Sequence, residues 1–328
     1  MLRYAGPYLF LASAPALYYG LGPAAPFLTI ATLLAVLLGA ELAVPRGDAA
    51  LANERPLAFR ALVLGYIPLQ VAAIAWGTWL SPQLGAWGFA ALACALGVTL
   101  GVFGVLAAHD AVHSGDRREA VLGLALLTAM SYRHFRIAHI HGHHRWAGCE
   151  KDAATARLGE SFYAFLGRTL PGQLREAWAF EQRRGGLRRN RVLGDLIIMA
   201  AILAAITALL GPRALAFFLL QSAVAITVLE LFNYIAHYGL ARRVDAEGRR
   251  ERLSERHSWN SSNVLANALI FNMGRHACHH ERPAAPFQAL TTRPGPELPL
   301  GYAGSILLAL APPLWRRVMD PRARAWAA

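Results

Sequence analysis

Histidine is concentrated in one part of the sequence, and its spacing points to metal binding. None of the twelve histidines lies in the first hundred residues. Eight of them fall into three tight groups, and crowding of unpaired imidazoles is unfavourable because protonating one disfavours protonating the next. A bound metal removes that penalty. The candidate ligands are His109, His113, His139, His143, His144, His276, His279 and His280, together with a lone His237.

Spacing within the groups predicts two metal ions. The stretch "HDAVH" places His109 and His113 on one helix face, where both rings can reach one centre. The stretches "HIHGHH" and "GRHACHH" each end in adjacent histidines, which diverge by about 100° on a helix and so serve two neighbouring metals better than one. One metal rarely takes more than six ligands, so nine imidazoles predict two ions. Imidazole alone does not choose between iron, copper, zinc and nickel.

The rest of the chain is apolar enough to be a membrane protein. Hydrophobic residues make up 55% of it and charged residues only 16%, a balance outside the usual range of soluble domains. We expect an all-α integral membrane protein, one domain over residues 1–328, with about six spanning helices and a cytosolic, histidine-rich helical cap. The predicted spans are 4–21, 26–44, 59–80, 85–108, 192–210 and 214–235.

Charge placement predicts the orientation of these spans. The short connections 22–25, 81–84 and 211–213 contain a single basic residue, Arg213, and every other Lys or Arg outside the spans falls on the opposite face. That face is cytoplasmic by the positive-inside rule, so both termini and the excursions 109–191 and 236–328 are predicted to be cytosolic. Topology therefore explains the net charge of +12 without nucleic acid. The last two spans form a hairpin that returns His237 and the final group beside the others.

Several other features of the sequence lead to structural predictions. Gly97 and Gly101 have the spacing of a close helix contact, although incidental glycines are equally expected in this chain. The apolar segments 120–132 and 298–314 are too short to span and should lie at the interface or against the bundle. The remaining histidines, His134, His141 and His257, are assigned supporting or solvent-facing roles. Three cysteines without a CxxC pair argue against disulfides, thiolate zinc and iron–sulfur clusters.

The four histidine segments resemble those of the integral-membrane di-iron family of fatty acid desaturases and hydroxylases, most closely its bacterial alkane 1-monooxygenase branch. That branch carries patterns like HE-x-x-H, EH-x-x-GHH, NY-x-EHYG and QRH-x-x-HH. They appear here as "HDAVH", "AHIHGHH", "NYIAHYGL" and "GRHACHH", with similar flanking text from about residue 104 to 321. The resemblance implies iron ligation by the nine histidines. His237 is included among the ligands only because of its location and this resemblance.

The chain departs from the family pattern beside four of these histidines. The glutamate of the first segment is Asp110, and the acidic residues before His139 and His237 are Ala138 and Ala236. The glutamine of the last segment is Gly274. Carboxylates next to ligating imidazoles orient the rings and tune the metal, so these departures bear on redox tuning and substrate choice.

The resemblance implies an O2-dependent non-haem di-iron oxidoreductase of the alkane 1-monooxygenase type in the bacterial inner membrane. It would hydroxylate the terminal carbon of an alkane or alkyl chain to a primary alcohol. Electrons would come from rubredoxin or ferredoxin with an NAD(P)H-dependent reductase, since no bound flavin, haem or Fe–S cluster is expected. The alternatives are a fatty acid desaturase or hydroxylase, a xylene-type aromatic-methyl monooxygenase and, from another class, a membrane metal-binding or transport protein. The stretch "RRGGLRRNR", residues 183–191, could dock an acidic carrier or simply anchor the adjacent span.

Overall fold

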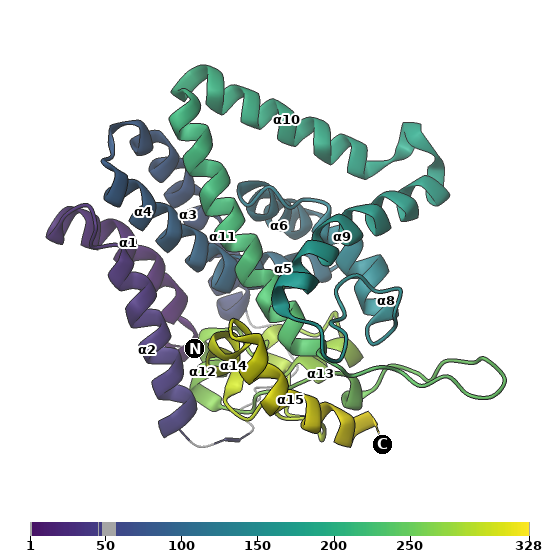
Figure 1. The fold of residues 1–328 in the computed structure, drawn as a ribbon. Coiled ribbons are helices and arrows are strands. Elements are labelled where there is room, and N and C mark those ends of the chain that lie inside the picture. The colour runs from purple at the N-terminus through teal and green to yellow at the C-terminus, as the bar shows by residue number, and fades with distance from the viewer. Residues whose placement is uncertain (1, 45, 48–56, 328) are drawn as a thin grey trace.

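All regular elements in the described part of the chain are helices. The computed structural model describes residues 2–44, 46–47 and 57–327 (Figure 1), and within these ranges extended segments meet only in isolated bridges. The predicted cytosolic loop between the second and third spans lies largely outside the described residues. The longer helices are α1 (Gly6–Leu21), α2 (Phe27–Ala43), α3 (Leu57–Leu80), α4 (Ala86–Thr99), α5 (Val105–His113), α6 (Arg117–Ala129), α9 (Phe162–Gly185), α10 (Arg191–Leu210), α11 (Pro212–His237), α12 (Val264–Leu269), α13 (His276–Glu281), α14 (Gly301–Ala309) and α15 (Pro312–Ala327).

Among the described residues, four helical segments are long and apolar enough to cross a membrane. They are Leu57–Gln83, Ala86–His113, Arg191–Leu210 and Pro212–His237, and they correspond to the last four predicted spans. The first two predicted spans form α1 and α2, which pack together as the expected hairpin but contain only 16 and 17 residues. A span perpendicular to the bilayer needs about 20 residues. The structure therefore confirms an all-helical, membrane-type chain with four spanning candidates, and six spans remain a prediction.

Glycines bring α4 and α11 into close contact. A Cβ atom on Gly97 would lie 2.7 Å from the carbonyl oxygen of Gln221, and one on Gly101 would lie 2.7 Å from that of Ala225. Any larger residue would separate the two helices, which confirms the close-packing interpretation of this glycine pair. The contact fixes the helix that leads to His109 against the helix that ends at His237.

The two short apolar segments pack against the bundle, as predicted. Helix α6 lies along α5 and α3, while α14 lies against α11 and α2. Glu41 of α2 ties α14 in place, because its carboxylate accepts the backbone N–H groups of Ala303 and Gly304 at 3.1 and 3.2 Å. These N–H groups have no partner inside the first turn of the helix, so the carboxylate acts as a cap.

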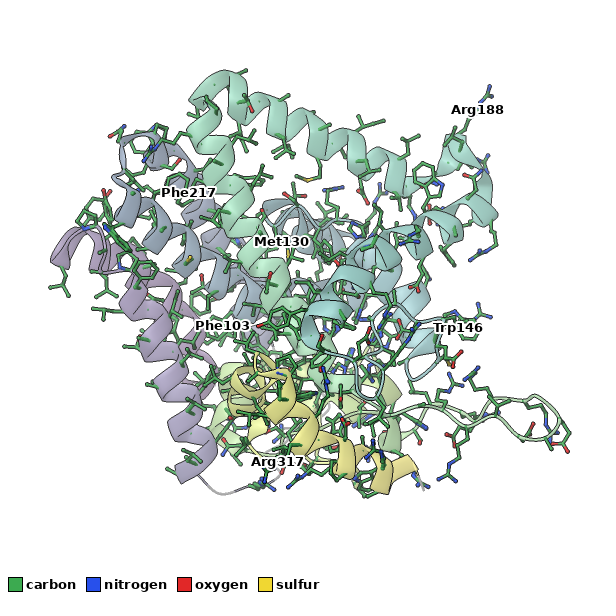
Figure 2. The ribbon with its side chains drawn as sticks, in the orientation of Figure 1. Phe103, Met130, Trp146, Arg188, Phe217 and Arg317 are labelled. Carbon is green, nitrogen blue, oxygen red and sulfur yellow. The ribbon has the colours of Figure 1, made fainter. Side chains whose placement is uncertain are left out.

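The histidine-bearing elements gather where α5 and α11 end. Figure 1 shows the α3–α4 and α10–α11 connections at one end of the molecule, and α12–α15 together with both termini towards the other. Side chains fill the bundle between them: Phe103, Met130 and Phe217 lie among the helices, whereas Arg188 projects outward (Figure 2). The ends of α5 and α11 therefore meet α8 and α13 next to the packed core.

Candidate metal centre

The nine predicted histidines lie together in two adjoining groups. Within each group the candidate ligand nitrogens all lie within 4.8 Å of one another. The five-histidine group consists of His109, His113, His139, His144 and His279. The four-histidine group consists of His143, His237, His276 and His280. The predicted division of adjacent histidines is thus what the structure shows, because each HH pair contributes one ring to each group.

The ring nitrogens in both groups are spaced like ligands around a metal. In the five-histidine group, Nε2 of His139 lies 2.8 Å from that of His109 and 2.9 Å from that of His144. Metal–nitrogen bonds of about 2.0–2.1 Å place neighbouring ligand nitrogens roughly 3 Å apart. The spacing therefore fits an ion held between the rings.

A triangle of nitrogens in the four-histidine group makes the same point. Nε2 of His237 lies 3.1 Å from Nε2 of His276 and 3.0 Å from that of His280, and the last two are 3.1 Å apart. Each Nε2 carries either one hydrogen or one lone pair in the ring plane, so three of them cannot all satisfy one another by hydrogen bonds. Lone pairs directed at a common cation resolve the conflict.

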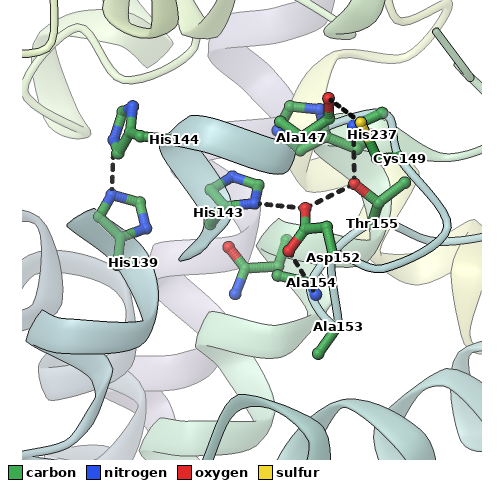
Figure 3. A network of polar contacts seen from close by, with 12 residues as sticks. His139, His143, His144, Ala147, Cys149, Asp152, Ala153, Ala154, Thr155 and His237 are labelled. Carbon is green, nitrogen blue, oxygen red and sulfur yellow. Dashed lines mark hydrogen bonds and ion pairs between the residues drawn. The ribbon is translucent and has the colours of Figure 1, made fainter. Parts of the chain in front are cut away.

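The outer nitrogen of His143 is fixed by a buried carboxylate. Nδ1 donates to Oδ2 of Asp152 at 2.8 Å, which leaves Nε2 as the free lone pair (Figure 3). The carboxylate also accepts the Thr155 hydroxyl at 2.7 Å and the Ala154 N–H at 3.0 Å. Burial by itself raises the pKa of Asp152, but His143 and these hydrogen bonds hold that pKa below its usual value. A carboxylate of this kind orients a metal-binding ring and increases its basicity.

A backbone carbonyl performs the same task for His237. Its Nδ1 donates to the carbonyl oxygen of His257 at 2.8 Å, so Nε2 again remains available. The ring of His257 is held apart from the metal centre: its Nδ1 accepts the Ser254 N–H, and its Nε2 donates to Glu251. The supporting role predicted for His257 is therefore carried by its main chain.

Local backbone geometry explains which histidines share a group. The segment Ala138–His143 (η4) is a π-helical turn, followed by α8 (His144–Trp146). A π turn brings residues five apart onto one face, so His139 pairs with His144 rather than with His143. In the regular helices α5 and α13, partners are four apart, as His109 with His113 and His276 with His280.

Burial favours the neutral form of five of the candidate ligands. It lowers the pKa of His139, His144, His276, His279 and His280 well below the usual value, and neighbouring histidines lower it further. Neutral imidazole is the form that binds a metal. The two other histidines outside the groups lie elsewhere: His141 stacks on Phe180 with ring centroids 4.2 Å apart, and His134 packs against Tyr132.

Asp110, at the position of the family's glutamate, follows the candidate ligand His109 in the chain, but its carboxylate is bonded to groups outside the metal centre. It accepts from Arg60 at 2.8 Å and from the Phe287 N–H at 3.3 Å, so it anchors α5 to α3 and to the segment after α13.

The other three departures are buried in the packing around the site. Ala138 and Ala236 are buried, and the carbonyl of Ala236 accepts the Trp259 N–H at 2.8 Å. A Cβ on Gly274 would lie 2.6 Å from Oδ1 of Asn267, so the space of the family's glutamine is occupied.

Sequence reasoning missed two supports of the site. Asp152 lies in the flanking sequence after the second histidine group, for which the residues indicate only a family resemblance, and the His257 carbonyl is a main-chain group that no residue type reveals. The sequence offers only a weak signal for Asp152, since Glu150 and Lys151 directly precede it in "EKDAATA" after the second histidine group.

A bundle of membrane-type helices that ends in two adjoining all-histidine sites defines a class of membrane metalloproteins. Within that class, the fatty acid desaturase family model matches residues 85–292. The chain belongs to this family, and within it to the alkane 1-monooxygenase branch.

Several curated relatives support that placement. The chain is 36% identical to alkane 1-monooxygenase 1 of Pseudomonas aeruginosa, over 81% of this chain and 72% of the relative. It is 34% identical to alkane 1-monooxygenase of Pseudomonas putida, over 97% of this chain and 79% of the relative. Similarity to the xylene/toluene monooxygenase hydroxylase component XylM of Pseudomonas putida is more distant, at 27% over 62% of this chain.

Proposed function

We propose that this protein is a membrane-bound, O2-dependent monooxygenase with two non-haem irons, which hydroxylates the terminal carbon of an alkane or alkyl chain to a primary alcohol. The observation that carries the proposal is the pair of adjoining histidine groups, five and four rings, in a chain more than a third identical to an alkane 1-monooxygenase over most of its length. Iron is favoured over zinc because oxygen activation requires a redox-active metal.

Each group of residues has a defined task in this function. The five- and four-histidine groups would each hold one iron, and the two irons supply the reduction of O2 and the oxidation of an unactivated C–H bond. Asp152 and the His257 carbonyl fix the tautomers of His143 and His237, so that both present a lone pair inward. Burial of the four-histidine group excludes water from that side of the site.

An apolar cavity next to the centre suits an alkyl substrate. It lies between α2, the α4–α5 segment, α11, α12 and α14, and its lining includes Leu106 and Phe232. Leu106 is three residues before His109, while the Phe232 ring lies 6.0 Å from that of His276 and stacks on Tyr302. We infer that these walls hold the end of the chain near the metals and bury its methylenes from water.

The proposal also includes an electron donor and an orientation in the membrane. We propose that rubredoxin or ferredoxin, reduced by an NAD(P)H-dependent reductase, delivers electrons from the cytosol. The chain would cross the bacterial inner membrane six times as one domain, with both termini and the metal centre cytoplasmic. The one-sided distribution of arginine supports this orientation.

Product analysis tests the function. Membranes containing the protein, supplied with rubredoxin, reductase and NADH, should convert octane or hexadecane to the 1-alkanol, measured by gas chromatography. A fatty acid and p-xylene serve as the competing substrates, the latter because of the likeness to XylM. Formation of methylbenzyl alcohol without alkanol would replace the alkane assignment by the methylarene one.

Metal analysis tests the centre separately. The purified protein should contain about two irons per chain. A single metal, or a haem absorbance band, would contradict the di-iron proposal whatever the substrate.

A further inference from the structure

A cluster of arginines lies where α9 and α10 meet the segment before η4. Arg136 has Arg133, Arg191, Asp195 and Glu181 as its charged neighbours. Ile137 and Val192, the residues beside Arg136 and Arg191, belong to one buried apolar cluster, so the two segments are packed together.

Each carboxylate in this cluster pairs with an arginine other than Arg136, although Oδ2 of Asp195 makes no hydrogen bond to the described residues. Arg133 pairs with Asp195 at 2.7 Å, and Arg191 pairs with Glu181 at 2.5 Å. The guanidinium of Arg136 makes no hydrogen bond to the described residues, and its Nε is buried. Its site therefore has surplus positive charge and an unused planar donor, the combination that recognises a phosphate group.

An apolar groove adjoins Arg133, one of these arginines. It runs between α3, α6, α10 and α11, and its walls include Ala125 and Thr128 of α6 and Ile202, Ile206 and Leu210 of α10. Thr128 connects the groove to the cluster, because its hydroxyl accepts from Arg133 at 2.7 Å. The α10 residues that line the groove, Ile202 to Leu210, cover about 12 Å of that helix at 1.5 Å per residue.

The helix that forms the outer wall is poorly covered by protein. Figure 1 shows α10 diverging from the bundle as it runs from the end of α9 to the start of α11. Ile197 and Leu209 on this helix are 61% and 81% exposed, in a segment apolar enough to span a membrane. An exposed apolar surface of this kind is stable when it contacts the acyl chains of lipids.

We propose that this groove and the arginine cluster form a binding site for one anionic phospholipid. The phosphate would lie against Arg136 and the surplus charge around it, and one acyl chain would follow the groove along α10. The site is separate from the metal centre, so it stands whether or not the proposed oxidation is correct. A bound lipid would fill the space between α10 and α6 and fix the segment that leads into η4.

Lipid retention tests the site. The full-length protein would be exchanged into nanodiscs of equal phosphatidylglycerol and phosphatidylcholine, released into detergent, and weighed by native mass spectrometry. We expect one retained phosphatidylglycerol, favoured at least tenfold over phosphatidylcholine. Equal retention of the two lipids by the unaltered protein would overturn the proposal.

Matched variants distinguish specific lipid binding at Arg136 from a nonspecific effect of positive charge. Arg136→Gln should reduce the tenfold preference to twofold or less. Arg188→Gln, which removes the same charge at an exposed position near the start of α10, should leave it unchanged. Unchanged iron content and circular dichroism would show that both variants fold. Retention by Arg136→Gln equal to that of the unaltered protein, or an equal loss in both variants, refutes the assignment.

A third variant tests the groove. Ala125→Trp places a large ring at an exposed position in the α6 wall and should also abolish the preference. Inorganic phosphate at 10 mM should not raise the unfolding temperature, whereas phosphatidylglycerol should. If Ala125→Trp retains the lipid fully, or phosphate alone stabilises as much as the lipid, a site that combines headgroup and chain is wrong.

Discussion

The two histidine groups differ in how firmly their rings are held. In the four-histidine group every ring is buried, and two of the rings, His143 and His237, have their outer nitrogens bonded to Asp152 and to the His257 carbonyl. In the five-histidine group His113 and His144 are partly exposed. The outer nitrogens of His109, His139 and His144 have no hydrogen-bond partner among the described residues, and neither do those of His276 and His280 in the four-histidine group. The difference is that two rings of the four-histidine group are anchored through their outer nitrogens.

This difference suggests a division of labour. Fixed tautomers and complete burial favour a permanently held metal with a constant environment. Five rings with fewer outer restraints can adjust as the metal changes its coordination, and partial exposure gives solvent and small molecules access. Helix α13 joins the two, since His276 and His280 belong to one group and His279 to the other.

Removing a ligand should give the largest effect and test whether the groups are separate. His237→Ala and His109→Ala should each lower hydroxylation by about a thousandfold or more, because the proposed function requires both irons to act together. Each should also lower iron from about two to about one per chain, measured by plasma mass spectrometry. Retention of two irons by either variant would show that the division into two metal positions is wrong.

The control for these variants comes from the same histidine-rich segment. His141 stacks on Phe180 and lies outside both groups. His141→Ala should keep two irons and an activity within about twofold of the unaltered protein. A loss of iron as large as that in His237→Ala would mean that His141 is a ligand in solution.

Asp152→Asn should weaken the four-histidine group selectively. The amide cannot act as the charged acceptor for Nδ1 of His143, and loss of such a partner typically costs 10–100-fold in metal affinity. Competition with a chelator should therefore release one iron per chain at a 10–100-fold lower chelator concentration, and leave the second iron unaffected. Equal loss from both positions would show that the restraint is shared across the centre.

Gly274→Gln should disturb both groups equally, which sharpens the contrast with Asp152→Asn. The new Cβ would lie 2.6 Å from Oδ1 of Asn267 and 3.0 Å from the carbonyl oxygen of Ser261, just before α13. Overpacking of this kind costs about 1–3 kcal/mol. Thermal unfolding of the detergent-solubilised protein should show the loss, with Gly167→Gln, at an open helical position, as the control. A stable variant with normal iron content would mean that Asn267 can move aside.

The sequence predicted most of the centre because its signals are local. Residues four apart on a helix and adjacent histidines have a geometry that any helix imposes, so His109 with His113, and His279 apart from His280, were predictable. The pairing of His139 with His144 was not, since a π turn leaves no pattern that distinguishes it from a regular helix. The His257 carbonyl was hidden for a different reason, because it depends on how a distant loop folds back onto α11.

The fold was predictable to a similar depth. Hydropathy identified the last four spans within a few residues, since long apolar runs have no other stable form. The first two predicted spans form α1 and α2, which are 16 and 17 residues long, so their crossing of the membrane remains a prediction. The surroundings of Gly274 could not be predicted. The sequence shows only that the family's glutamine is replaced by glycine, whereas the structure shows that Asn267 occupies the space of that side chain.

The smallest expected effect concerns Glu176, a carboxylate next to the Asp152 that supports the four-histidine group. Glu176 of α9 accepts the Ala153 N–H at 2.8 Å, next to Asp152. Burial, with a further contribution from Asp152, raises the pKa of Glu176 to about 7. In the folded protein it therefore holds a proton between about pH 4.5 and 7, whereas in the unfolded chain it does not. The unfolded state binds fewer protons in this window, so the contribution of Glu176 to stability falls as pH rises through it.

Glu176→Gln should remove that pH dependence. Between pH 5 and 7.5 the unfolding temperature of the unaltered protein should fall by about 2 °C more than that of the variant, a modest shift because the side chain is partly exposed. Glu150→Gln, at an exposed position in the same loop as Asp152, should behave like the unaltered protein. A parallel course for Glu176→Gln and the unaltered protein would show that Glu176 is ionised throughout, and that Asp152 supports His143 beside a second negative charge.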